Sequence, residues 1–205
     1  MRYAGAVHCP RPARDRELVQ IVDAALDDAA RRAGSWLACR IGCTQCCIGA
    51  FAINALDAAR LREGLAHLES VDPSRARRIQ LRAKTYIERV SAQFPGDSAS
   101  GILDETVEAQ ERFLDFANEE VCPALDPESG GCDLYEFRPM TCRVFGPPVR
   151  NEGGGLGVCE LCFHGASDED IARCEMKPDP DCLEDALLSE IAQSGNTLVA
   201  FALAK

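Results

Sequence analysis

Cysteine placement constrains this chain more than any other feature of its sequence. The stretch CRIGCTQCC, residues 39–47, holds four cysteines in nine positions, and the last two are adjacent. Five more cysteines fall within residues 121–166, where proline and glycine are dense and helical periodicity is lost. A long irregular stretch in a compact domain needs something besides a hydrophobic core to order it. Metal ligation by thiolates can supply that order.

Length and composition favour a thiol-rich protein that does not depend on disulfides. With 205 residues the chain can bury a substantial core, so its twelve cysteines are not required as cross-links. The first residues show no signal-peptide pattern, and no apolar run reaches the length of a membrane span. We therefore expect a cytoplasmic protein, because thiols stay reduced there and are then available to metal.

The charge balance bears on the choice of partners. The formal net charge of −11 argues against nucleic acid, whose phosphates need a basic face, and equally against an anionic membrane. An unknown protein partner stays open.

The expected fold class is mainly α, in a single domain over residues 1–205. Hydrophobic content is 46% with only 6% aromatic residues, a balance that suits packed helices better than a β-sandwich. Helices are expected over residues 13–120 and again over 167–205. Between them, the irregular cysteine-rich segment 121–166 is expected to bind metal and pack against the helices.

Several helices can be placed individually. Apolar residues recur at helical spacing from Asp15 to about Arg32. Asn54 and Asp72 are the expected N-caps of the next two helices. A fourth helix is expected from about Asp104 to Glu120, with an inward face of Ala109, Phe113, Phe116 and Ala117. Shorter helices are expected near residues 167–177 and 181–193, and the apolar TLVAFALA is either an edge strand or a docked tail.

The first cysteine group fits more than one metal. Cys39, Cys43 and Cys46 are spaced so that all three can share one helical turn or tight loop. Zinc takes four such ligands, and an iron–sulfur cluster also takes four, spread over a larger cuboid. The adjacent pair Cys46 and Cys47 fits one small ion poorly. A larger cluster, or two metals, accommodates the pair more easily.

The second group supplies further ligands. Cys122 precedes Pro123, which stiffens the loop, and Cys132 follows two glycines, which allow a tight backbone turn. Cys142 lies between Arg138 and Arg143, whose charge would lower thiol pKa values and offset a thiolate cluster. Alternatively, these arginines pair with Glu136 or Asp133 on the surface. Tyr135 and Phe137 are expected to pack beneath this loop.

The remaining thiols have weaker signals. Cys159 and Cys162, in CELC, either complete a metal site, with His164 as a possible extra ligand, or pack in a small satellite core; a CxxC pair is also a redox motif. The scattered Cys9, Cys174 and Cys182 are expected to be buried small hydrophobes rather than ligands. His8 and His67 are expected to have no catalytic role.

Three blocks together resemble a known family: CRIGCTQCCIGAFAINALDAARL, CPALD and GCDLYEFRPMTCRVFGPP. They are similar to the YkgJ-type cysteine-cluster family, named for its CxxCxxCC pattern and described as zinc- or iron-chelating. The resemblance covers about residues 39–70 and 121–148. It implies a metal-ligand set at Cys39, Cys43, Cys46, Cys47, Cys122, Cys132 and Cys142. One departure is that three residues, not two, separate Cys39 from Cys43.

Three functional hypotheses follow. The first is a protein that holds an iron–sulfur cluster, most simply [4Fe–4S], for electron transfer, metal handling or support of a partner's chemistry. Its metal ligands are drawn from Cys39, Cys43, Cys46, Cys47, Cys122, Cys132, Cys142, Cys159 and Cys162. The second is a structural zinc protein that acts in protein contacts. The third is a metal-dependent enzyme or a free thiolate such as Cys47 acting on a small or basic substrate, although no established catalytic motif is present.

Overall fold

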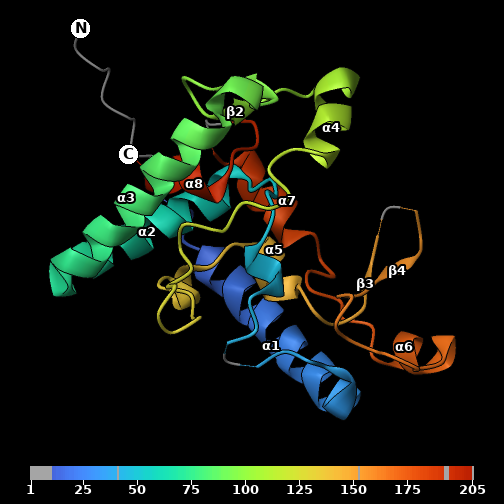
Figure 1. Ribbon diagram of the computed structural model, residues 1–205. Helices are drawn as coiled ribbons and strands as arrows, with labels where there is room; N and C mark the ends of the chain where they lie inside the picture. The colour runs from blue at the N-terminus through green and yellow to red at the C-terminus, as the bar shows by residue number, and fades with distance from the viewer. Residues whose placement is uncertain (1–10, 41, 152, 192–193, 205) are drawn as a thin grey trace, which may run out of the picture.

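The computed structural model describes residues 11–40, 42–151, 153–191 and 194–204. Within that part of the chain the fold is mainly α, as predicted, with only two short two-stranded sheets (Figure 1). Its α-helices are α1 (Asp15–Ala33), α2 (Ala55–Val71), α3 (Pro73–Val90), α4 (Val107–Leu114), α5 (Met140–Val144), α6 (Asp168–Arg173), α7 (Leu183–Ser189) and α8 (Val199–Leu203). His8 and Cys9 lie outside the described residues.

Local signals place the three long helices. The side chain of Asn54 accepts a hydrogen bond from the Asp57 N–H at 3.0 Å, and the side chain of Asp72 accepts one from the Arg75 N–H at 3.0 Å. Both predicted N-caps are therefore confirmed, because each satisfies an N–H that has no partner inside its helix. Helix α1 ends at Ala33, directly before Gly34, which has a positive φ of 51°.

Helix α4 is shorter than predicted. It starts after Thr106, whose side chain accepts from the Ala109 N–H, and it ends at Leu114 rather than near Glu120. Ala117 has a φ of 53°, which a continuing helix does not allow. The predicted inward face is nevertheless correct, since Ala109 and Phe116 are buried and Phe113 and Ala117 pack against the same core.

The C-terminal helices are also shorter than predicted, and the tail is a helix. Beyond α6 the chain turns extended, so that the Met176 N–H donates to the Pro148 carbonyl at 2.8 Å. Helix α7 starts only at Leu183, after Cys182 with a left-handed φ of 53°. The edge-strand alternative for the terminal segment is wrong, because α8 is a buried helix docked against α2 and α3.

Two antiparallel hairpins complete the secondary structure. Strands β1 (Gly96–Asp97) and β2 (Ile102–Leu103) pair Gly96 with Leu103. Strands β3 (Val149–Arg150) and β4 (Leu156–Gly157) pair Val149 with Gly157. The second hairpin and two short helical segments interrupt residues 121–166, and the other described residues of this segment form no helix or strand, as predicted.

The main core lies where α2, α3 and α8 meet, as Figure 1 shows on one side of the molecule. Leu61, Ile79 and Leu203 are almost completely buried there. Cys122, Cys132 and Phe137 pack against this core from the irregular segment. The predicted packing of the cysteine-rich segment on the helices is therefore observed. No helix among the described residues is long and apolar enough to cross a membrane.

Candidate metal centre

Nine cysteines of the two predicted groups separate in space into two sets. We call Cys46, Cys47, Cys122, Cys132 and Cys142 the five-thiol group, and Cys39, Cys43, Cys159 and Cys162 the four-thiol group. For the seven of these cysteines whose pKa is shifted, every thiol that contributes to the shift belongs to the same group. All nine are free thiols in the structure, so none is a disulfide partner.

Backbone pairing brings Cys46 and Cys47 to Cys122. The Cys122 N–H donates to the Cys47 carbonyl at 2.8 Å, and Ile48 forms an antiparallel bridge with Val121. A short 3-10 helix, Gln45–Cys47, presents the two adjacent thiols. Segments more than 70 residues apart in the sequence are thereby joined side by side.

A tight turn then returns the chain from Cys122 to Cys132. Leu125 bridges Cys132, and the Asp133 N–H donates to the Ala124 carbonyl at 2.8 Å. The carboxylate of Asp133, 2% exposed, accepts from Arg75 and Arg82 of α3, each at 2.5 Å. Asp133 therefore fixes the Cys132 turn to α3.

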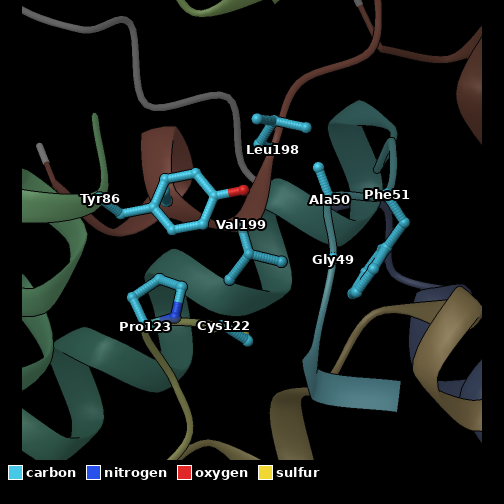
Figure 2. A pocket seen from close by; sticks show the side chains of 9 residues that line it. Gly49, Ala50, Phe51, Tyr86, Cys122, Pro123, Leu198 and Val199 are labelled. Carbon is cyan, nitrogen blue, oxygen red and sulfur yellow. The ribbon is translucent and has the colours of Figure 1, made fainter. Parts of the chain in front are cut away.

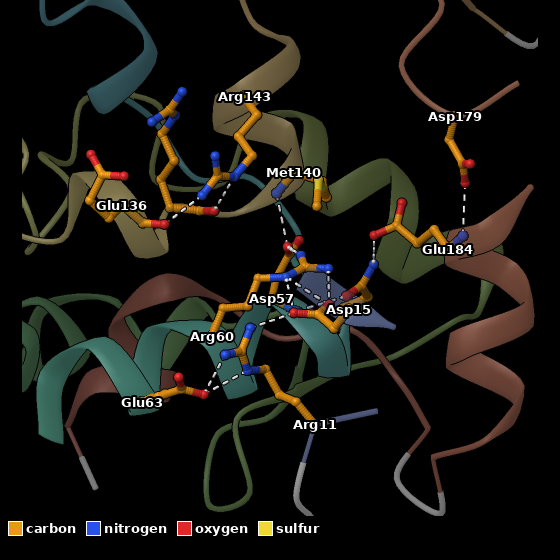
Figure 3. A network of polar contacts seen from close by, with 12 residues as sticks. Arg11, Asp15, Asp57, Arg60, Glu63, Glu136, Met140, Arg143, Asp179 and Glu184 are labelled. Carbon is orange, nitrogen blue, oxygen red and sulfur yellow. Dashed lines mark hydrogen bonds and ion pairs between the residues drawn. The ribbon is translucent and has the colours of Figure 1, made fainter. Parts of the chain in front are cut away.

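Cys142 lies on α5, whose first N–H is capped from α2. Asp57 Oδ1 accepts from the Met140 N–H at 2.8 Å (Figure 3). The same carboxylate pairs with Arg60, which also binds Asp15 of α1, and all three side chains are buried. This network, centred on Arg60 in Figure 3, joins α1, α2 and α5.

Arg143 and Arg138 do not pair with Glu136 or Asp133 at the surface. Arg143 is buried, and its Nη1 donates to both Asp23 carboxylate oxygens at 2.6 and 2.7 Å. Arg143 also donates to two backbone carbonyls, those of Glu136 and Arg138. The surface-pair alternative is wrong, because the Asp23 carboxylate and the loop's own backbone carbonyls accept the hydrogen bonds of the Arg143 guanidinium.

Arg138 lies beside the five-thiol group. Its guanidinium stacks on the Tyr135 ring, with Cζ 3.9 Å from the ring centroid. Tyr135 is 56% exposed, so its predicted burial beneath the loop is wrong. Phe137 does pack inward, against Gly64 of α2, where any Cβ would stand 2.5 Å from the Phe137 ring.

Electrostatics divide the five thiols. Burial raises the pKa of Cys122 to about 12 and raises that of Cys142 well above its usual value. A hydrogen bond between the adjacent thiols lowers the pKa of Cys46, helped by the nearby Arg138, and raises that of Cys47. The two adjacent thiols therefore differ in acidity, and Cys46 is the more acidic of the pair. A metal cation would reverse the cost of ionising these buried thiols.

The four-thiol group forms where residues 36–43 meet residues 146–163. The Ala38 N–H donates to the Cys162 sulfur at 3.4 Å, and the Phe163 N–H donates to the Trp36 carbonyl at 2.8 Å. Cys159 and Cys162 are buried in a small cluster with Phe163, so the packing expected of CELC as a satellite core is observed.

The remaining candidates among the described residues differ in their relation to the two groups. His164 is exposed, and the His67 ring lies 6.2 Å from the Phe137 ring. Cys174 is buried in the satellite cluster as expected, whereas Cys182 is exposed and its expected burial is wrong.

A pocket beside Cys122 has a cavity volume of about 10 Å³, room for one water molecule. Figure 2 shows Tyr86 and Pro123 on one side of it and Ala50 and Phe51 on the other.

Two observations test whether the residues fit a metal. Among the described residues, no group of three or more His, Cys, Asp or Glu side chains already has the arrangement of a ready metal-ion site. The donor chemistry does fit, because the thiols are soft ligands, free of disulfides, gathered in two neighbourhoods, and one neighbourhood lies beside a guanidinium. Thiol-rich metal sites commonly close only when the ion binds.

A family model described as "CxxCxxCC: Putative zinc- or iron-chelating domain" matches residues 38–162. The chain belongs to this family. The match begins just before Cys39 and ends at Cys162, so it includes both thiol groups of the CxxCxxCC domain. No curated protein and no solved structure matched the chain.

Sequence reasoning missed the charged residues that hold the CxxCxxCC domain together. The sequence pattern gives Asp15 and Asp23 no role and gives Asp57 only a part in capping its own helix with Asn54, although each of the three contacts a buried arginine. Asp57 follows its N-cap Asn54 by three residues, which reads as an ordinary first-turn acid. Only its contact with Met140, 83 residues away, gives it a role beside Cys142.

Proposed function

We propose that the five-thiol group binds an iron–sulfur cluster, most simply [4Fe–4S], in a cytoplasmic protein. The cluster would serve electron transfer, metal handling or the chemistry of a protein partner. The observation that carries the proposal is that five free thiols from three stretches of chain lie close enough to influence one another's pKa, with the backbone of Cys47 bonded to that of Cys122. When bound, such a cluster supplies one-electron redox chemistry or an iron site for transfer.

The number and placement of the thiols favour a cluster over one small ion. A [4Fe–4S] cluster takes four thiolates spread over a cuboid, and five partly buried thiols are available. Adjacent Cys46 and Cys47 would strain a single tetrahedral ion if both bound it, whereas the larger cuboid of a cluster accommodates the pair more easily. Arg138 beside Cys46 would offset the negative charge of the bound thiolates.

The surrounding frame supports a rigid site. Two ligand-bearing segments, and the loop between them, are each held by a charged side chain. Asp57 caps the helix of Cys142, Asp133 fixes the Cys132 turn, and Arg143 holds the loop between them. Residues that orient ligands in this way commonly tune metal affinity and redox potential.

The test is elemental and spectroscopic analysis of anaerobically purified protein. We expect brown protein with the broad visible absorption of an iron–sulfur cluster and about four iron and four sulfide per chain. Substitution of Cys122 and Cys142 by serine should abolish the colour. Colourless protein that carries zinc in the five-thiol group would contradict the proposal.

A structural zinc protein is the second candidate. It is favoured by the scarcity of regular structure in residues 121–166, since structural zinc contributes folding energy directly to such segments. Chelation should then unfold that segment while iron is absent throughout. A metal-free protein with unchanged circular dichroism and melting temperature would exclude this candidate.

A further inference from the structure

We propose that the four-thiol group is a second metal site that takes a single zinc ion, independent of the five-thiol group. The proposal goes beyond the proposed function and does not depend on iron being bound elsewhere. Under this proposal the five-thiol group binds an iron–sulfur cluster, and the four-thiol group binds one zinc ion through all four of its thiolates.

The spacing within this group is that of a zinc site. Cys39 and Cys43 have three intervening residues, and Cys159 and Cys162 have two. Two short chelating loops of two to four intervening residues, each giving two thiolates, are the usual way to build a closed tetrahedral site. The group has no adjacent pair, and its four thiols come from two loops, while Cys174 packs in the apolar cluster beneath them. A separate site also accounts for the unusual Cys39–Cys43 spacing, because the Cys39 sulfur lies against Gly146, whose carbonyl faces the Cys159 N–H.

Backbone contacts hold the two loops face to face. The Ala38 N–H donates to the Cys162 sulfur at 3.4 Å, the kind of N–H···S contact that stabilises a thiolate. The Cys39 sulfur lies over Gly146, where a Cβ would stand only 2.8 Å away. The Cys159 N–H in turn points to the Gly146 carbonyl at 3.5 Å. Gly146 therefore lets Cys39 approach the loop that carries Cys159 and Cys162.

The segment that carries Cys159 and Cys162 has little regular structure of its own, and a bound zinc ion would stabilise it. Apart from the short hairpin β3–β4, the described residues of 145–166 lack helices and strands, and the apolar cluster beneath them has few buried members: Ala33, Cys159, Cys162, Phe163 and Cys174. So small a cluster contributes little burial. A zinc ion would fix residues 146–163 to the end of α1, and its binding energy would draw the four thiols into the tetrahedron.

The experiment compares metal content in full-length protein and paired variants, purified anaerobically. Wild-type protein should contain about one zinc per chain, and the C159S/C162S variant should lose it while keeping its iron. The C122S/C142S variant should do the opposite, and C182S, an exposed cysteine outside both groups, should change neither metal. Loss of iron in C159S/C162S, or retention of zinc there, would overturn the proposal.

Two further measurements keep the test decisive if C159S/C162S does not fold. Cobalt added to wild-type protein stripped of zinc should give the visible bands of a tetrahedral thiolate site. Zinc should also protect the four-thiol group from alkylation, as read by mass spectrometry, while Cys182 reacts either way.

Protection of Cys122, Cys132 and Cys142 instead, or a Cys159–Cys162 disulfide in fresh protein, would overturn the second site. Zinc without iron would leave this proposal standing and contradict only the iron–sulfur function.

Discussion

Asp57 on α2 accepts a hydrogen bond from the Met140 N–H, 83 residues later, at 2.8 Å, and so caps the helix that carries Cys142. The contact is buried, and Asp57 also pairs with Arg60, which is 1% exposed. One carboxylate thus links the helical core to a candidate ligand. Replacing Asp57 therefore tests whether this capping contact affects metal binding.

Replacement of Asp57 by alanine should lower the free energy of unfolding by about 2–4 kcal/mol, because a buried N–H and part of Arg60 lose their partner. Metal retention should fall with it. Asp57→Asn is the matched control, since its side-chain oxygen can still accept a hydrogen bond from the Met140 N–H. This variant should lose less stability than Asp57→Ala. Urea titration measures the free energy of unfolding, and iron analysis measures metal retention. Equal decreases in Asp57→Ala and Asp57→Asn would argue against the capping role.

Replacement of Asp133 by alanine should release the Cys132 turn from Arg75 and Arg82. We expect the free energy of unfolding to fall by about 2–3 kcal/mol, because two arginines lose their pairing with a carboxylate that is 2% exposed. Iron should dissociate faster in the presence of a chelator. Glu128→Ala, an exposed acid in the same turn, should leave the dissociation rate unchanged.

Replacement of Arg143 by alanine should be costly because three acceptors lose their donor: the Asp23 carboxylate and the carbonyls of Glu136 and Arg138. A loss of about 3 kcal/mol is expected, as for other buried hydrogen-bonded charges. Arg150→Ala is the control, since Arg150 pairs with Glu175 while half exposed and should cost under about 1 kcal/mol. Similar melting temperatures for the two variants would refute this ranking.

Replacement of Gly146 by alanine should displace Cys39, because the new methyl would stand 2.8 Å from the sulfur. Gly154→Ala separates this clash from backbone strain: both glycines have positive φ, but Gly154 has nothing within 4 Å. Each should lose about 1 kcal/mol through strain. Only Gly146→Ala should also bind zinc more weakly, as measured by competition with a chromophoric chelator.

Replacement of Cys46 by serine should remove the iron–sulfur cluster, whereas Cys47→Ser should retain it. Cys46 is the one member that affects the pKa of each of the other four thiols, which places it centrally in the five-thiol group. Four thiolates suffice for a cluster, so Cys47 is the fifth. Visible absorption of the two variants decides; loss of colour in Cys47→Ser alone would reverse the assignment.

Local features of the sequence determined the long helices and the family. Asn54 and Asp72 cap their own helices through N–H groups three residues away, so their role can be inferred without tertiary information. The CxxCxxCC blocks likewise carry the family in their own residues. Helix ends near Ala117 and Cys182 could not be placed, because left-handed φ values at non-glycine residues leave no clear mark in the sequence.

Only the tertiary structure divided the nine cysteines into two groups. By spacing, Cys39, Cys43 and Cys46 belong together, yet Cys39 and Cys43 lie with Cys159 and Cys162 while Cys46 lies with Cys122 and Cys142. The physical reason is that each group is assembled by contacts across more than 70 residues, such as Cys122 with Cys47 and Ala38 with Cys162. Sequence spacing records which thiols share a loop; the packing of loops on helices decides which thiols can share a metal.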